Sequence, residues 1–182
     1  MKHTISVLVE NHFGVLAHVA GLFSSRGFNI NSLAVGETED PSISRMTIVV
    51  GGDEHVLEQV MKQLNKLVDV IKVVDMTNQE SIDRELVLVK VNVTSSTRME
   101  VMQIVQTFRA KIVDASSNVM TIEVTGTDSK VDAMLELMQP YGIKEVARTG
   151  VISMARKSEV VGKKTVTTKS TKKHVQSKKK NK

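Results

Sequence analysis

The chain of 182 residues contains no cysteine, no tryptophan and only two prolines. Without cysteine it forms no disulfide bond and offers no thiolate for catalysis or for binding zinc. Long apolar runs are missing as well, since none approaches the roughly 20 residues that span a bilayer. The first residues lack the charged-then-apolar pattern of a secretory signal. We therefore expect a cytoplasmic protein that makes no contact with a membrane.

Aromatic residues are scarce, at 3% of the chain. RNA-recognition domains of the sheet type stack bases on aromatic side chains of their central strands, and the segment from Ser44 to Val50 contains none. Catalytic patterns are missing too. The five histidines form no HExxH motif, and His12 and His18 are not at the i, i+4 spacing of a helical metal site. We expect neither catalytic residues nor a metal site on this chain.

The net charge of +5 conceals two oppositely charged regions. Residues 157–182 contain ten lysines and one acidic residue, whereas residues 1–156 contain 15 basic and 19 acidic residues. The lysine-rich segment consists mainly of Ser, Thr and Lys and cannot bury enough apolar surface to fold. We expect a disordered basic tail over 157–182, which either only improves solubility or binds weakly to a polyanion such as nucleic acid.

The rest of the chain carries one pattern of strands and helices twice. Alternating apolar residues predict strands, and apolar residues at i, i+3, i+4 and i+7 predict helices. In the first copy the predicted order is strand 3–9, helix 14–26, strands 28–38 and 43–51, helix 53–67 and strand 69–77. In the second copy it is strand 85–93, helical stripe 101–108, strands 112–114 and 119–124, helical stripe 131–138 and strand 143–153.

Each copy has the order βαββαβ, which predicts a ferredoxin-like domain: a four-stranded antiparallel sheet with two helices on one face. We therefore predict an α+β protein of two tandem ferredoxin-like domains, 1–78 and 84–156, joined by a polar linker at 79–83. In the first helix, the predicted buried stripe consists of Leu16, Val19, Ala20 and Phe23. Gly27 is expected to end that helix in a left-handed conformation, and Asp53 to cap the next one.

The loop between the first strand and the first helix has the composition of an anion site. Gly14 has no Cβ, so a ligand can approach backbone amides at the start of the helix, and Asn11 is suited to capping those amides. Asn29 is expected near the same end of the sheet. An amino-acid ligand would then lie among apolar side chains, the candidates being Phe13, Val15, Ile30 and Leu33, although Leu33 is better explained by ordinary core packing.

Several segments of this sequence carry a family resemblance. They are residues 5–16, residues 21–33 with the run Gly27-Phe28-Asn29-Ile30, residues 44–50 and residues 84–86. Together they resemble the ACT domain and following domain of the regulatory (small) subunit of acetohydroxyacid synthase, also called acetolactate synthase. The resemblance covers roughly residues 1–156 and leaves the basic tail unexplained.

The resemblance implies a chain without catalytic activity or cofactors of its own. Its partner would be a catalytic subunit that carries thiamine diphosphate, Mg²⁺ and FAD and makes acetolactate for branched-chain amino acid biosynthesis. The small subunit would activate this partner and confer feedback inhibition by valine. It would form a homodimer through its ACT domain, residues 1–78, with valine held between Asn11, Gly14 and Val15 of one protomer and Asn29 and Ile30 of the other.

The residues also admit an alternative function. A free-standing ACT protein that senses an amino acid would share the same loop and fold, and its lysine-rich tail would bind nucleic acid. The fold by itself does not decide between the two functions, because ferredoxin-like domains serve many unrelated ones.

Overall fold

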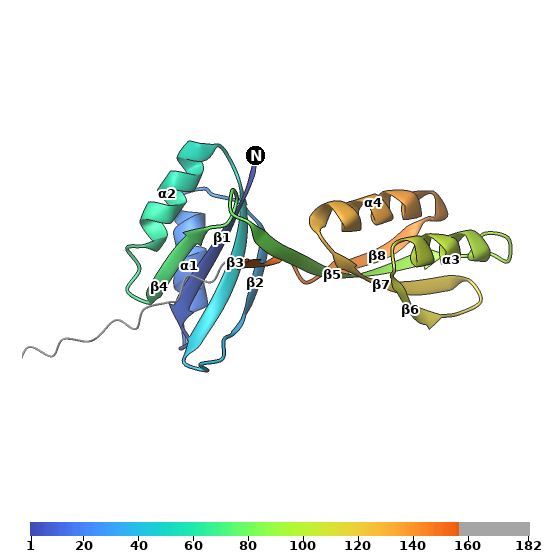
Figure 1. Ribbon diagram of the computed structural model, residues 1–182, viewed down its shortest axis with the longest axis horizontal. Coiled ribbons are helices and arrows are strands. Elements are labelled where there is room, and N and C mark those ends of the chain that lie inside the picture. Colours follow the sequence, from blue (N-terminus) through green and yellow to red (C-terminus); the bar gives the residue numbers. More distant parts are fainter. Residues whose placement is uncertain (157–182) are drawn as a thin grey trace, which may run out of the picture.

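The structure, a computed structural model, describes residues 1–156, so the expected basic tail lies outside the described residues. Two α+β units lie end to end, with strand β5 running between them (Figure 1). The first unit consists of β1 (Lys2–Glu10), α1 (Val15–Ser25), β2 (Ile30–Glu37), β3 (Ile43–Gly51), α2 (Glu54–Leu64) and β4 (Val70–Asp75). The second consists of β5 (Ser81–Asn92), α3 (Arg98–Thr107), β6 (Lys111–Ala115), β7 (Val119–Gly126), α4 (Asp128–Met138), the short 3₁₀ helix Gln139–Tyr141 and β8 (Ile143–Arg148).

The two units have the same topology. Their strand orders are β2-β3-β1-β4 and β6-β7-β5-β8, and all neighbouring strands are antiparallel. Helices α1 and α2 cover one face of the first sheet, and α3 and α4 cover one face of the second (Figure 1). The expected α+β fold with two tandem ferredoxin-like domains is confirmed.

The core of the first unit lies between the sheet and its helices. Strand alternation directs Ile5, Val7 and Val9 toward the helices, where each is at most 1% exposed. From α2, Val60 and Leu64 complete this core and are fully buried. The second unit has a separate core of the same construction.

The buried face of α1 is rotated relative to the predicted stripe. Val19 and Phe23 are buried as expected, but Leu16 is 44% exposed and Val15 is buried instead, together with Leu22. Positions i, i+4, i+7 and i+8 also form one face of a helix. Both stripes are periodic, so only packing against the sheet selects the one that is buried.

The local signals at helix ends agree with the structure. Asp53 caps α2, with one carboxylate oxygen accepting a hydrogen bond of 2.9 Å from the Val56 amide. Gly27 follows α1 at φ 68°, in the left-handed region. Both features depend on neighbouring residues alone, which is why the sequence predicts them.

The end of the described chain differs from the single strand expected over 143–153. The chain turns at Gly150, with φ 81°, and continues as β9 (Ile152–Ala155). Strand β9 pairs with Ser81–Arg84, so β5 begins inside the segment expected to be a polar linker. This extra strand pair forms only because residues 70 positions apart meet, as Ser153 and Asp83 do.

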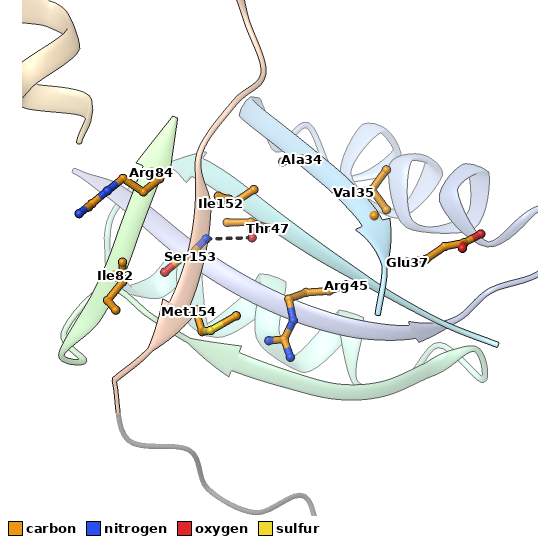
Figure 2. A pocket seen from close by; sticks show the side chains of 11 residues that line it. Ala34, Val35, Glu37, Arg45, Thr47, Ile82, Arg84, Ile152, Ser153 and Met154 are labelled. Atoms are coloured by element: carbon orange, nitrogen blue, oxygen red, sulfur yellow. Dashed lines mark hydrogen bonds between the residues drawn. The ribbon is translucent and has the colours of Figure 1, made fainter. Parts of the chain in front are cut away.

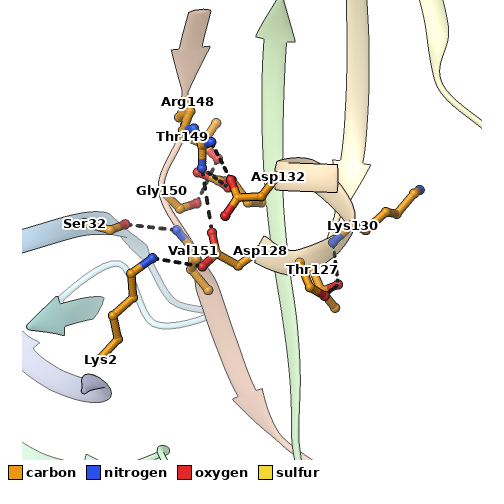
Figure 3. Close-up of polar contacts among 12 residues, drawn as sticks. Lys2, Ser32, Thr127, Asp128, Lys130, Asp132, Arg148, Thr149, Gly150 and Val151 are labelled. Atoms are coloured by element: carbon orange, nitrogen blue, oxygen red, sulfur yellow. Dashed lines mark hydrogen bonds and ion pairs between the residues drawn. The ribbon is translucent and has the colours of Figure 1, made fainter. Parts of the chain in front are cut away.

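Strand β9 also ties the second unit to the first. The Ser153 amide donates to Thr47 Oγ1 at 3.3 Å, and Thr47 lies on the face of the first sheet opposite to the helices. Nearby, the Val151 amide donates to Ser32 Oγ at 3.1 Å, and Lys2 pairs with Asp128 at 3.1 Å (Figure 3). The junction therefore joins the two units by direct contacts as well as by the chain.

One buried carboxylate belongs to this junction. The side chain of Glu85 is only 4% exposed, and Arg148 lies 3.3 Å from it while also binding Asp132 at 2.8 Å. Burial raises the pKa of Glu85, although the charge of Arg148 acts in the opposite direction.

Candidate functional site

The loop between β1 and α1 ends in a glycine that begins the helix. Gly14 occupies the N-cap position at φ 92°, and no side chain among residues 1–156 caps α1. The His18 amide donates to the Gly14 carbonyl at 2.9 Å, which is the first bond of the regular helix. The amides that precede it in the first turn have no partner within a helix, so they are suited to an anion such as a carboxylate.

Asn11 does not cap these amides, contrary to expectation. Its side-chain amide instead donates to the Pro41 carbonyl at 2.8 Å and to a Glu37 carboxylate oxygen at 3.2 Å. Asn11 therefore joins the loop to the end of strand β2. Glu37 is a functional candidate that the sequence did not reveal, because the two residues are 26 positions apart.

The candidate apolar residues divide into two groups. Val15 is 3% exposed and belongs to the core, so only its backbone can contact a ligand at this loop. Ile30 and Leu33 are half-buried against the same core, as core packing predicts for Leu33. Phe13, in contrast, is fully exposed at the tip of the loop.

Asn29 lies at the opposite end of the sheet from Asn11, so the expectation that they share one end is wrong. Ile30 pairs with Val50, which in turn pairs with His3 at the start of β1, whereas Asn11 follows the end of β1. The intervening length of strand is about 23 Å. The reason is topological: α1 runs antiparallel to β1 and returns the chain to the end where β1 began.

Strand β2 is an outer strand of its sheet, bonded only to β3 on the path of the described strands. Beside it lies a pocket of ≈ 390 Å³ between β3, the start of β5 and β9 (Figure 2). Four exposed apolar side chains line it: Val35, Ile82, Ile152 and Met154. Arg45 is placed beside them by a hydrogen bond of 3.3 Å to Ser6. The pocket escapes sequence analysis because it combines segments that are distant along the chain.

Within residues 1–156, no helix is both long enough and apolar enough to cross a membrane.

Models of known protein families match both domains of this chain. Residues 5–72 match a family model described as an AHAS small subunit-like ACT domain, and residues 84–157 match one for the small subunit of acetolactate synthase. The chain is 52% identical over 160 residues to the acetolactate synthase small subunit of Mycolicibacterium smegmatis, covering 88% of this chain and 94% of the relative. The chain belongs to the acetolactate synthase small-subunit family.

Other members of the acetolactate synthase small-subunit family are also similar to this chain over most of its length. A probable small subunit from Archaeoglobus fulgidus is 57% identical over 156 residues, with 86% of this chain and 98% of the relative covered. The crystal structure of the Thermotoga maritima acetolactate synthase small subunit superposes with a TM-score of 0.78 at 42% identity, covering 87% of this chain and 99% of that one. The chain is thus a regulatory subunit for branched-chain amino acid biosynthesis, whose partner is a catalytic subunit.

Proposed function

We propose that this regulatory subunit activates the catalytic subunit of acetolactate synthase in the cytoplasm and makes it sensitive to feedback inhibition by valine. The catalytic subunit supplies thiamine diphosphate, Mg²⁺ and FAD, and this chain supplies no catalytic group. Membership of the small-subunit family supports the partnership. The ACT domain, residues 1–78, holds the effector.

The effector site lies between two copies of the chain. Its two halves are at opposite ends of one sheet: Asn11, Gly14 and Val15 form the first, and Asn29 and Ile30 the second. When two β2 edges pair antiparallel, the start of one β2 comes beside the end of the other. The hydrogen bond between Asn11 and Glu37, which ties the loop to the end of β2, is the observation that carries this proposal. A two-fold axis then produces two equivalent sites.

The surface beside β2 has the chemistry of a contact between copies. Val35 on the outer strand is 49% exposed, and Ile152 and Met154 next to it are 59% and 61% exposed. An outer strand presents unpaired backbone donors and acceptors that another strand can satisfy. Burial of these apolar side chains against a second copy would add to that pairing.

Each part of valine meets a complementary group in this arrangement. The amides of Leu16 and Ala17, which follow Gly14 at the start of α1, bind the carboxylate, whereas the Val15 amide already donates to the His12 carbonyl at 3.5 Å. Glu37 and the side-chain oxygen of the partner's Asn29 accept hydrogen bonds from the ammonium group. Ile30 contacts the aliphatic side chain. Valine inhibits if it binds the less active state of the complex more tightly, and a coupling of about 1 to 3 kcal/mol changes affinity 5- to 150-fold.

The direct test measures acetolactate formation by the matching catalytic subunit, with and without this chain, over a valine titration. We expect faster turnover and new or stronger inhibition by valine. No effect on either would refute the proposal, and stimulation without valine sensitivity would refute the effector site alone.

A pair of edge variants tests the site between copies. Val35→Lys puts a charge on the outer strand β2 and should yield monomers in sedimentation experiments, with loss of valine sensitivity. Val113→Lys is the matched control, because Val113 is 51% exposed on β6, the outer strand of the second sheet. Dimers that persist in Val35→Lys, or that are lost equally in both variants, would contradict pairing through β2.

A further inference from the structure

Two histidines and two carboxylates gather beside the β1–α1 loop. His12 Nε2 lies 3.4 Å from a Glu10 carboxylate oxygen and 3.3 Å from Asp69 Oδ1. His18 Nδ1 lies 3.0 Å from the other oxygen of Asp69. Asp69 comes from the segment between α2 and β4, so the fold brings it to the loop from 51 positions beyond His18. The sequence spacing of the histidines therefore could not reveal this cluster.

The spacing of three of these groups matches a metal site. One ligand atom each from Glu10, His12 and Asp69 lies within 4.8 Å of the others. In a tetrahedral site with bonds of about 2.0 to 2.1 Å, neighbouring ligand atoms are about 3.3 to 3.4 Å apart. The two distances from His12 Nε2 to the carboxylates, 3.3 and 3.4 Å, equal this separation.

The hydrogen bonds around the cluster orient its groups as ligands. His12 Nδ1 lies 3.0 Å from the Phe13 carbonyl, and donation to that oxygen leaves Nε2 as the ring atom that faces the carboxylates, where a bound metal ion would take the place of the proton of the ion pair. Metal-binding histidines characteristically donate their second ring nitrogen in this way. His18 does the equivalent for Asp69, because its Nδ1 lies 3.0 Å from the second carboxylate oxygen of Asp69 and fixes the orientation of that group.

Charge and ligand type indicate which ion fits. Two carboxylates carry the charge that balances a divalent cation, and imidazole nitrogen favours zinc and similar transition metals over Mg²⁺. The side chain of Asp69 is 18% exposed, whereas those of Glu10 and His12 are about half exposed. The open side leaves room for a water molecule as a fourth ligand.

We propose that Glu10, His12 and Asp69 form a binding site for a divalent transition-metal ion of the zinc type. His18 is a positioning residue that orients Asp69 through the carboxylate oxygen that does not face His12. The site adjoins the proposed effector groups, because His12 lies between Asn11 and Gly14 in the same loop and the His18 ring lies 4.0 Å from the Cβ position at Gly14. The proposal differs from the expectation from sequence that this chain has no metal site, and the binding experiment decides between the two.

The experiment measures Zn²⁺ binding to the untagged full chain by calorimetry and by metal analysis after dialysis, in the presence of millimolar Mg²⁺. We expect one Zn²⁺ per chain at this site. His12→Gln and Asp69→Asn should each weaken binding roughly 100-fold or more. His55→Gln is the matched control, because His55 is exposed on α2, away from the cluster, and binding should not change.

Cobalt provides a readout of coordination geometry. Co²⁺ in a four-coordinate site should give intense visible absorption, which His12→Gln abolishes. His18→Ala should weaken binding about tenfold, and His18→Asn should restore it, because the asparagine amide can donate to Asp69 as His18 Nδ1 does. This rescue separates positioning of the ligand from a general effect on the fold.

Three results would overturn the proposal: no Zn²⁺ binding in the micromolar range, equal binding by wild type and His12→Gln, or displacement of Zn²⁺ by Mg²⁺. Equal binding would identify the interaction as an adventitious one elsewhere on the chain. Far-UV circular dichroism establishes that each variant is folded. Glu10→Gln, whose side chain is 59% exposed, provides a further ligand variant with little structural risk and should also weaken binding.

Discussion

Replacement of Gly14 tests the effector site most sharply. At φ 92° an L-residue costs about 1 to 2 kcal/mol, and within residues 1–156 an added Cβ would meet, apart from its chain neighbours, atoms of the His18 ring at 4.0 Å. A protein with a stability of about 5 to 15 kcal/mol tolerates this strain. Gly14→Asp and Gly14→Asn have side chains of the same shape and similar strain, so the difference between them isolates the effect of one negative charge.

The expected size of that difference follows from Coulomb's law. If the new carboxylate lies about 6 Å from the carboxylate of valine, the repulsion is about 0.7 kcal/mol at the dielectric constant of water and about 2.8 kcal/mol at an effective value of 20. Gly14→Asp should therefore require roughly 3 to 100 times more valine for half-inhibition than Gly14→Asn. Added salt should narrow the gap, because ions screen exposed charges.

The assay is acetolactate formation by the reconstituted complex over a valine titration, with each variant's own rate without valine as its reference. Superimposable valine curves for Gly14→Asp and Gly14→Asn would refute the placement of the effector carboxylate beside Gly14. If added salt does not reduce the difference between the two variants in the valine concentration for half-inhibition, the electrostatic origin of that difference is refuted.

Three further predictions concern the fold. Leu64→Ala empties a fully buried position and should lower the free energy of unfolding by about 2 to 5 kcal/mol in urea; a loss below about 1 kcal/mol would contradict the tight core. Gly150→Ala puts a Cβ 2.5 Å from Ser32 Oγ at a residue with φ 81°, so it should lower the free energy of unfolding by about 1 to 3 kcal/mol and speed proteolysis between the units. Gly21→Ala is the control, because its Cβ meets no atom of the described residues within 4 Å. Because burial raises the pKa of Glu85, its stabilising contribution is complete below the ordinary glutamate pKa and is lost as pH rises through the raised value. The free energy of unfolding between pH 4 and 7.5 should therefore change less with pH in Glu85→Gln than in the wild type. Identical slopes of this free energy against pH would exclude the carboxylate of Glu85 as the source of the pH dependence.

Much of the fold could be predicted from neighbouring residues. The alternation of Ile5, Val7 and Val9, the cap at Asp53 and the left-handed Gly27 were all confirmed, because each depends on geometry within a few positions of the chain. Repetition of the βαββαβ order then predicted two domains of one topology. The buried stripe of α1 was predicted in part: Val19 and Phe23 are buried as expected, but Val15 and Leu22 are buried in place of Leu16 and Ala20, since two stripes satisfy the same period.

The candidate site was less accessible to sequence. Gly14 was recognised as the start of a helix with free amides, but the partner of Asn11, the carboxylate of Glu37, became evident only from the folded hairpin. The position predicted for Asn29 was wrong, because it depends on the direction in which α1 returns the chain. The apolar periodicity of the sequence does not specify that direction.

The sequence by itself determined most of the secondary structure and the tandem fold, because these follow from local patterns repeated along the chain, and the resemblance of particular segments indicated the family. Only the tertiary structure decided which distant residues meet, as Asp69 does with His12 and β9 with the start of β5. It also decided that Asn11 and Asn29, the two proposed halves of the effector site, lie at opposite ends of a sheet. The physical reason is that strand register and helix packing are set by burial summed over a whole domain, and no short segment records that sum.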